Sequence, residues 1–169
     1  MLNAARRGIL GLVAALVMGG AAHAENALPP VKLYAPKVCL ACIDYAEYLR
    51  NNGFTVSVET PDDMAAVKRR LKVPRALEAE PTAVIGRYFI EGHVPAEDIK
   101  EFLAEKPKAR GLAVPGLPLG APGREFSSPT CDTACTVLDQ ESGNKRIRRE
   151  LYDTLLVKPD GDTSIYGRH

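Results

Sequence analysis

The stretch VKLYAPKVCLACIDYAEYLRNNGFTVSVE, residues 31–59, holds the pattern that decides the fold. Residues 31–35 predict a strand. Apolar side chains then recur at helical spacing from Cys42 onward, until NNG closes the helix. Residues 54–59 alternate apolar and polar side chains, as a half-buried strand does. The order strand, helix, strand predicts two parallel strands joined by a helical crossover, with Cys39 at the turn between strand and helix.

The rest of the chain extends this unit to an α/β domain. We expect a second helix capped by Thr60, with Pro61 in its first turn. The later elements follow in order: strands in PTAVIG and YFIEG, a third helix at 95–106, an irregular but packed Gly/Pro-rich segment at 111–123, and a closing hairpin at 152–169. This order predicts a thioredoxin-like domain, with a central mixed sheet, flanking helices and a C-terminal β-hairpin.

The beginning of the chain, residues 1–24, has the pattern of a cleavable signal peptide. Two arginines precede the apolar run GILGLVAALVM, and AHA follows as a cleavage site. Cleavage would leave a single domain at 25–169 and remove two arginines, so the formal net charge falls from +1 to −1. We therefore expect a periplasmic protein without membrane contact after cleavage. A nearly neutral chain also argues against nucleic acid as a partner.

The strongest chemical signal is the CxxC motif formed by Cys39 and Cys42. Free N–H groups and the helix dipole at a helix N-terminus favour a thiolate. A thiolate is both a nucleophile and a ligand for soft metals. In the oxidising periplasm the pair can also close as a disulfide. The motif therefore predicts a redox or metal site, and a permanent structural disulfide is the alternative.

Two further residues are candidates for this site. Pro81 lies directly before the strand that follows the second helix, where thioredoxin-like folds place a cis-proline facing the CxxC pair. An ordinary trans proline at the start of a strand is the alternative. His93 precedes the third helix, where it either packs and hydrogen-bonds locally or serves as a metal ligand.

The polar insertion at 124–150 carries the second cysteine pair, Cys131 and Cys135. A local disulfide that pins the insertion is the plainest interpretation. The pair could instead exchange disulfides with the CxxC motif. It could also supply the second half of a four-thiolate metal site.

Together these motifs resemble the CopG-like family of periplasmic copper-resistance proteins over most of the mature chain. The resemblance is carried by VCLACIDYAEYLRNNGF, AAVKRRLKVP, FIEGHVPAEDIKEFLAEKP, GLAVPGLPLGAPG and YDTLLVKPDG. It implies a thioredoxin-like fold whose cysteines bind copper(I), with redox chemistry as a further role.

The chain departs from the family pattern where soft ligands are expected. The family usually has C-x-C-C in its first motif, whereas this chain has Ala41 in place of the middle cysteine between Cys39 and Cys42. Where the family usually has Cys-His before the third strand, this chain has Glu80-Pro81. The methionines usual around the Gly/Pro-rich segment are Leu117 and Arg124 here. These replacements argue against a multi-copper thiolate cluster. The plain CxxC with Pro81 looks more like a thiol–disulfide oxidoreductase.

The sequence thus predicts a protein of copper or metal homeostasis that uses CxxC for copper(I) binding or thiol redox. In the redox version Cys39 is the nucleophile, Cys42 resolves the mixed disulfide and Pro81 shapes the substrate edge. In the metal version Cys39 and Cys42 bind copper(I), completed by His93 or by Cys131–Cys135. The alternatives are an oxidoreductase for protein disulfides without a metal, and a non-catalytic interaction module with structural disulfides. The expected partner is a soft metal ion or a protein thiol or disulfide.

Overall fold

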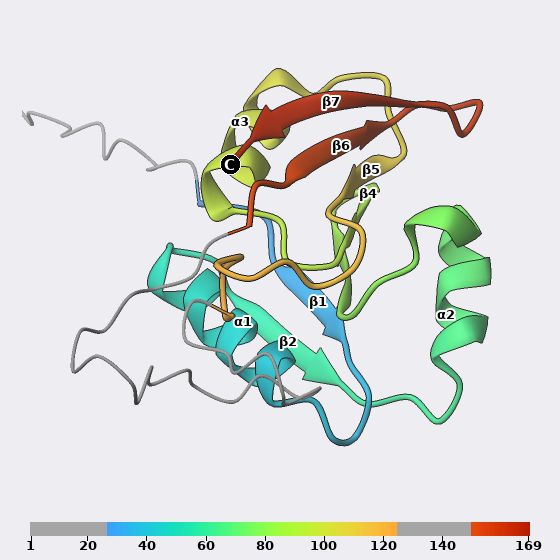
Figure 1. Ribbon diagram of the computed structural model, residues 1–169. Helices are drawn as coiled ribbons and strands as arrows, with labels where there is room; N and C mark the ends of the chain where they lie inside the picture. Colours follow the sequence, from blue (N-terminus) through green and yellow to red (C-terminus); the bar gives the residue numbers. More distant parts are fainter. Residues whose placement is uncertain (1–26, 125–149) are drawn as a thin grey trace, which may run out of the picture.

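The computed structural model describes residues 27–124 and 150–169. The elements in chain order are β1 Val31–Tyr34, α1 Leu40–Asn51, β2 Val56–Glu59, α2 Met64–Leu71, the 3-10 turn η1 Arg75–Leu77, β3 Thr82–Ile85, β4 Tyr88–Glu91, α3 Ala96–Glu105, β5 Gly111–Ala113, β6 Asp153–Val157 and β7 Thr163–Arg168 (Figure 1). The predicted signal peptide and most of the polar insertion, with Cys131 and Cys135, lie outside the described residues.

The strands form one mixed sheet in the order β2-β1-β3-β4-β5-β6-β7. β1 pairs with β2 in parallel through the α1 crossover, and β3 lies antiparallel to β1 and to β4. α3 then carries the chain to β5, which is parallel to β4, and the β6–β7 hairpin extends the sheet beyond it. The predicted α/β fold is confirmed, with its central mixed sheet, flanking helices and C-terminal β-hairpin.

The two faces of the sheet are covered unequally. Neighbouring residues of a strand point to opposite faces. Ile90 of β4 therefore joins the larger hydrophobic core, where Leu49 of α1 and Phe102 of α3 pack. Phe89 points the other way, into a smaller core next to Leu71 of α2. In Figure 1, α2 accordingly stands apart from α1 and α3.

Two local expectations were wrong. α2 does not begin at Thr60: Asp63 is its N-cap, and the carboxylate of Asp63 accepts the N–H of Ala66 at 2.8 Å. The Gly/Pro-rich segment is not irregular throughout, because Gly111–Ala113 pairs with β4 and β6 as strand β5.

The rest of the Gly/Pro-rich segment packs against the first turns of α1, as expected. Gly123 has φ +78°, and a Cβ there would lie 2.7 Å from the backbone nitrogen of Tyr45. Only glycine therefore fits this close approach. Within the described part of the chain, no helix is long and apolar enough to cross a membrane.

Candidate thiol and metal site

Cys39 and Cys42 form a disulfide at the N-terminus of α1, with Cα atoms 5.3 Å apart. Cys39 is the N-cap, and its Sγ accepts the backbone N–H of Cys42 at 3.2 Å. Cys39 is half-buried, whereas Cys42 is only 1% exposed. An incoming nucleophile or metal therefore reaches the Cys39 sulfur first. After reduction, the same N–H and the helix dipole stabilise a Cys39 thiolate.

The Glu80–Pro81 peptide bond is cis, as predicted for this position. The carbonyl of Pro81 accepts the N–H of Gly92 at 2.8 Å, which joins this turn to the end of β4. Gly92 is itself constrained, since its φ is +74° and a Cβ there would lie 2.3 Å from the carbonyl oxygen of Val114. The chain segments that carry Pro81 and His93 are thus held against each other.

A cleft of about 380 Å³ connects the CxxC motif with this turn. Its lining includes Cys39, Ala41, Ala79, Glu80, His93 and Leu117. Ala41, Glu80 and Leu117 are three of the positions at which the sequence departs from the CopG-like pattern. Residues far apart in the sequence therefore meet at one place, and the positions where the resemblance implied soft ligands line the same cleft as Cys39 and His93.

His93 is completely buried, and its ring has one satisfied nitrogen. Nδ1 lies 2.5 Å from the carbonyl oxygen of Pro122. A carbonyl can only accept, so we assign the ring proton to Nδ1. Nε2 then keeps its lone pair, and no group of the described residues meets hydrogen-bond geometry with it, although the backbone carbonyl of Glu80 also acts on the ring and raises its pKa. Metal-binding histidines commonly donate their second ring N–H to a carbonyl in this way.

Burial keeps the His93 ring neutral at pH 7. Burial is the largest effect, and it lowers the pKa of His93 to about 4. The carbonyl of Pro122 raises this pKa, the charge of Arg124 lowers it, and the carbonyl of Glu80 raises it, each by less than burial lowers it. A neutral imidazole can ligate a metal without first losing a proton. His93 therefore combines the local hydrogen bond of the plain interpretation with the lone pair required of a ligand.

A buried ion pair behind the cleft was not predicted. The ammonium of Lys68 on α2 donates to Glu91 Oε1 at 2.5 Å, to Thr82 Oγ1 at 2.7 Å and to the carbonyl of Ala79. Burial raises the pKa of Glu91, and the hydrogen bond from Lys68 lowers it. The one signal in the sequence was the acid Glu91 in the otherwise apolar strand YFIE.

The cysteines and His93 do not form a ready metal site in this disulfide-bonded state. Across residues 27–124 and 150–169, no group of three or more His, Cys, Asp or Glu side chains could hold a metal ion. The structure therefore places Cys39 and His93 in one cleft but does not show them coordinating together. Cys131 and Cys135 lie outside the described residues, and their pairing stays a prediction.

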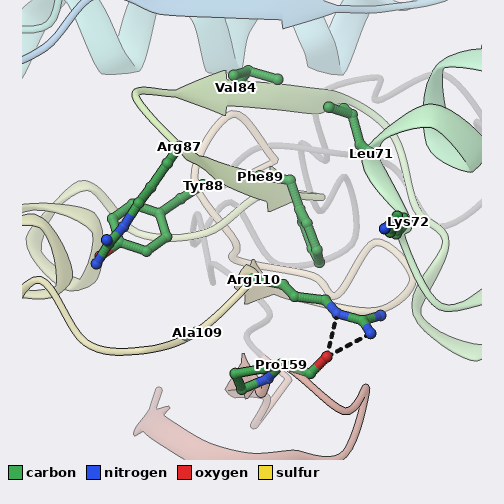
Figure 2. Close-up of a pocket in the computed structure, with 9 residues that line it drawn as sticks. All are labelled: Leu71, Lys72, Val84, Arg87, Tyr88, Phe89, Ala109, Arg110 and Pro159. Carbon is green, nitrogen blue, oxygen red and sulfur yellow. Dashed lines mark hydrogen bonds between the residues drawn. The ribbon is translucent and has the colours of Figure 1, made fainter.

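A second hollow, of about 340 Å³, is separate from the thiol site (Figure 2). It lies by the end of α2 and the turn of the β6–β7 hairpin, and its lining contains no cysteine or histidine. Figure 2 shows Phe89 pointing toward Arg110, whose guanidinium donates two hydrogen bonds to the carbonyl of Pro159, at 2.9 and 2.5 Å. Both bonds join Arg110 to the hairpin turn at the lining of the hollow.

Comparison with known proteins places part of the cleft lining inside a recognised sequence family. Residues 79–124 match a family model described as a protein of unknown function, DUF411. That stretch contains Glu80, Pro81, His93 and Leu117. No curated protein matches the chain.

Two solved structures are similar over nearly their full length. They are forms 1 and 2 of the copper resistance protein CopG, each 31% identical to this chain, with TM-scores of 0.67 and 0.68. Each similarity covers 84% of this chain and 98% of the CopG chain. At this identity and coverage, the chain belongs to the CopG-like copper-resistance family.

Proposed function

We propose that the reduced protein binds copper(I) in the periplasm through the thiolates of Cys39 and Cys42, with His93 completing the site. The observation that carries the proposal is the lone pair of His93 Nε2, buried in the same cleft as Cys39. Copper(I) is a soft ion that prefers thiolate ligands and also accepts imidazole. Membership of the CopG-like family supports a copper-related role, and the predicted signal peptide supports the location.

Copper(I) is the cargo in this proposal, and the disulfide must open before it binds. A thiol reductant supplies two electrons and two protons, which convert the Cys39–Cys42 bond into two thiols. Copper(I) then displaces the thiol protons, helped by the N–H of Cys42 and the helix dipole. The His93 ring is already neutral and needs no deprotonation. Opening of the disulfide by this reductant would thus permit copper(I) uptake.

Cys131 and Cys135 remain candidates for a second thiol pair. The insertion that carries them leaves the described structure after Arg124, whose guanidinium donates to the carbonyl of Leu117 in the cleft wall. It re-enters at Glu150, whose N–H donates to the carbonyl of Leu119 at 2.9 Å. The seven residues from Arg124 to Cys131 can span about 25 Å when extended. That length supports exchange with the CxxC pair or completion of a four-thiolate site.

A second candidate function is thiol–disulfide exchange with protein substrates. The exposed apolar side chains of Val38, Leu40 and Ile43 around the motif favour it. In this reaction the Cys39 thiolate attacks a substrate disulfide and expels one substrate thiolate. Cys42 then attacks the mixed disulfide, which releases the reduced substrate and re-forms the Cys39–Cys42 bond.

An anaerobic titration tests the copper proposal. Reduced mature protein would compete with a copper(I) chelator, as wild type, as Cys39→Ser and as Cys131→Ser/Cys135→Ser. Loss of tight binding in Cys39→Ser alone supports a two-thiolate site built from the CxxC motif. Loss in both variants indicates a four-thiolate site. Absence of tight binding in wild type refutes copper binding, and turnover of a protein disulfide then tests the second candidate.

A further inference from the structure

The buried ion pair Lys68–Glu91 has a geometry that stability alone does not explain. Glu91 is completely buried and Lys68 nearly so. The ammonium of Lys68 lies 3.8 Å from a second carboxylate, that of Glu80. Oε2 of Glu80 and Oε2 of Glu91 have no hydrogen-bond partner in the described part of the chain. Because apolar residues often replace buried ion pairs without loss of stability, this arrangement suggests another role.

The hydrogen bonds of the pair surround the cis-proline turn. Glu91 Oε1 accepts the N–H of Ala79 at 2.8 Å, while Lys68 donates to the carbonyl of the same residue. Lys68 also donates to the hydroxyl of Thr82, directly after Pro81. The pair thus bonds to the backbone of Ala79 before Glu80–Pro81 and to the side chain of Thr82 after it. Apolar side chains of equal volume could not make these directed bonds.

The same pair is joined to the segment that carries His93. Glu91 ends β4, and Gly92 and His93 follow it directly. Its carboxylate therefore ties the start of the His93 segment to Ala79, which lines the cleft together with Glu80 and Cys39. Two walls of the cleft consequently depend on one buried contact.

We propose that Lys68 and Glu91 are positioning residues for the CxxC site: they hold the cis-proline turn and His93 in place opposite Cys39. This proposal rests on the proposed function of that site. Residues that orient metal ligands from behind typically change metal affinity by about 10- to 100-fold when removed.

The test replaces the pair by apolar residues of similar volume, as Lys68→Met/Glu91→Leu, so that neither charge is left unpaired. Val157→Ala, in the smaller core away from the cleft, serves as the control for a general loss of packing. We expect the double variant to bind copper(I) about 10- to 100-fold more weakly, with the control at the wild-type value. Glu91→Gln keeps an acceptor for the Ala79 N–H, so we expect it to lose less copper(I) affinity than the double variant. Wild-type affinity in a folded double variant would overturn the proposal.

A second readout does not need copper. Reduced Cys39 is allowed to react with two disulfides. We expect the first, a peptide disulfide, to lie along the turn at Pro81, whereas the second, hydroxyethyl disulfide, does not depend on that turn. The double variant should react about tenfold more slowly with the peptide and at the wild-type rate with the small reagent. Equal rates with the peptide in both proteins contradict the positioning role. If wild type binds no copper(I), the copper proposal fails, and the reaction with the peptide disulfide alone decides whether Lys68 and Glu91 are positioning residues. If the double variant does not fold, Glu91→Gln is measured in its place. Unchanged affinity and reaction rate in Glu91→Gln would then overturn the positioning proposal.

Discussion

Replacement of His93 by glutamine should change how stability depends on pH in a measurable way. Burial lowers the pKa of this histidine to about 4 in the folded protein, against about 6.5 in the unfolded chain. Between these values the unfolded chain binds one more proton than the folded one. Stability therefore rises with pH by about 1.4 kcal/mol per unit, for a total of about 3 kcal/mol.

The sign of this contribution follows from the lowered pKa. The stability due to neutral His93 is fully present above about pH 6.5 and is lost as the pH falls toward about 4. Glu80 and Glu91 act in the opposite direction, because burial raises the pKa of each carboxyl. Their contribution is full below the unfolded value and is lost as the pH rises through the folded value. Only a difference between wild type and variant isolates the histidine.

The assay is urea unfolding of the oxidised protein at half-unit steps from about pH 4 to 7, for wild type and His93→Gln. Glutamine can still donate to the carbonyl of Pro122 but does not titrate. We expect the wild-type curve to be steeper by about 1.4 kcal/mol per pH unit over this range. Parallel curves would refute the neutral, buried state assigned to His93 and, with it, the availability of Nε2 as a ligand.

Three further substitutions and one control, Lys32→Met, test the fold and the buried ion pair, each by chemical unfolding. Asp63→Ala removes the N-cap of α2 and should cost about 1 kcal/mol; an unchanged midpoint would contradict the assigned helix start. Gly123→Ala should cost about 1–3 kcal/mol, because its Cβ would meet the backbone of α1, and full retention of stability would refute that close approach. Lys68→Met should cost about 3–5 kcal/mol by leaving Glu91 without its cation, whereas Lys32→Met, at a half-exposed pair, should cost less than about 1 kcal/mol. Equal losses in the two lysine variants would show that Lys68 is not buried as described.

The element order could be predicted because its signals are local. The alternation and helical spacing in residues 31–59 indicated a parallel crossover, and β1, α1 and β2 confirm it. Strand β5 escaped prediction because three residues carry no period, and it exists only through its pairing with β4 and β6. The start of α2 was placed wrongly because Thr60 and Asp63 are both good N-caps. Local sequence does not decide between them.

The site was predictable in position but not in detail. The turn between strand and helix located Cys39, and the place of Pro81 before β3 predicted its cis bond. The orientation of His93 depends on a carbonyl 29 residues away, at Pro122. The Lys68–Glu91 bond joins α2 to β4 across 23 residues. Such contacts arise from tertiary packing, and no spacing rule in the sequence reports them.

The most direct test of the central claim is X-ray absorption at the copper edge, measured on the reduced, copper(I)-loaded protein and on its His93→Gln variant. A site built from Cys39, Cys42 and His93 predicts sulfur neighbours together with an imidazole signal that disappears in the variant. Identical spectra from the two proteins, or a first shell without sulfur, would contradict the site.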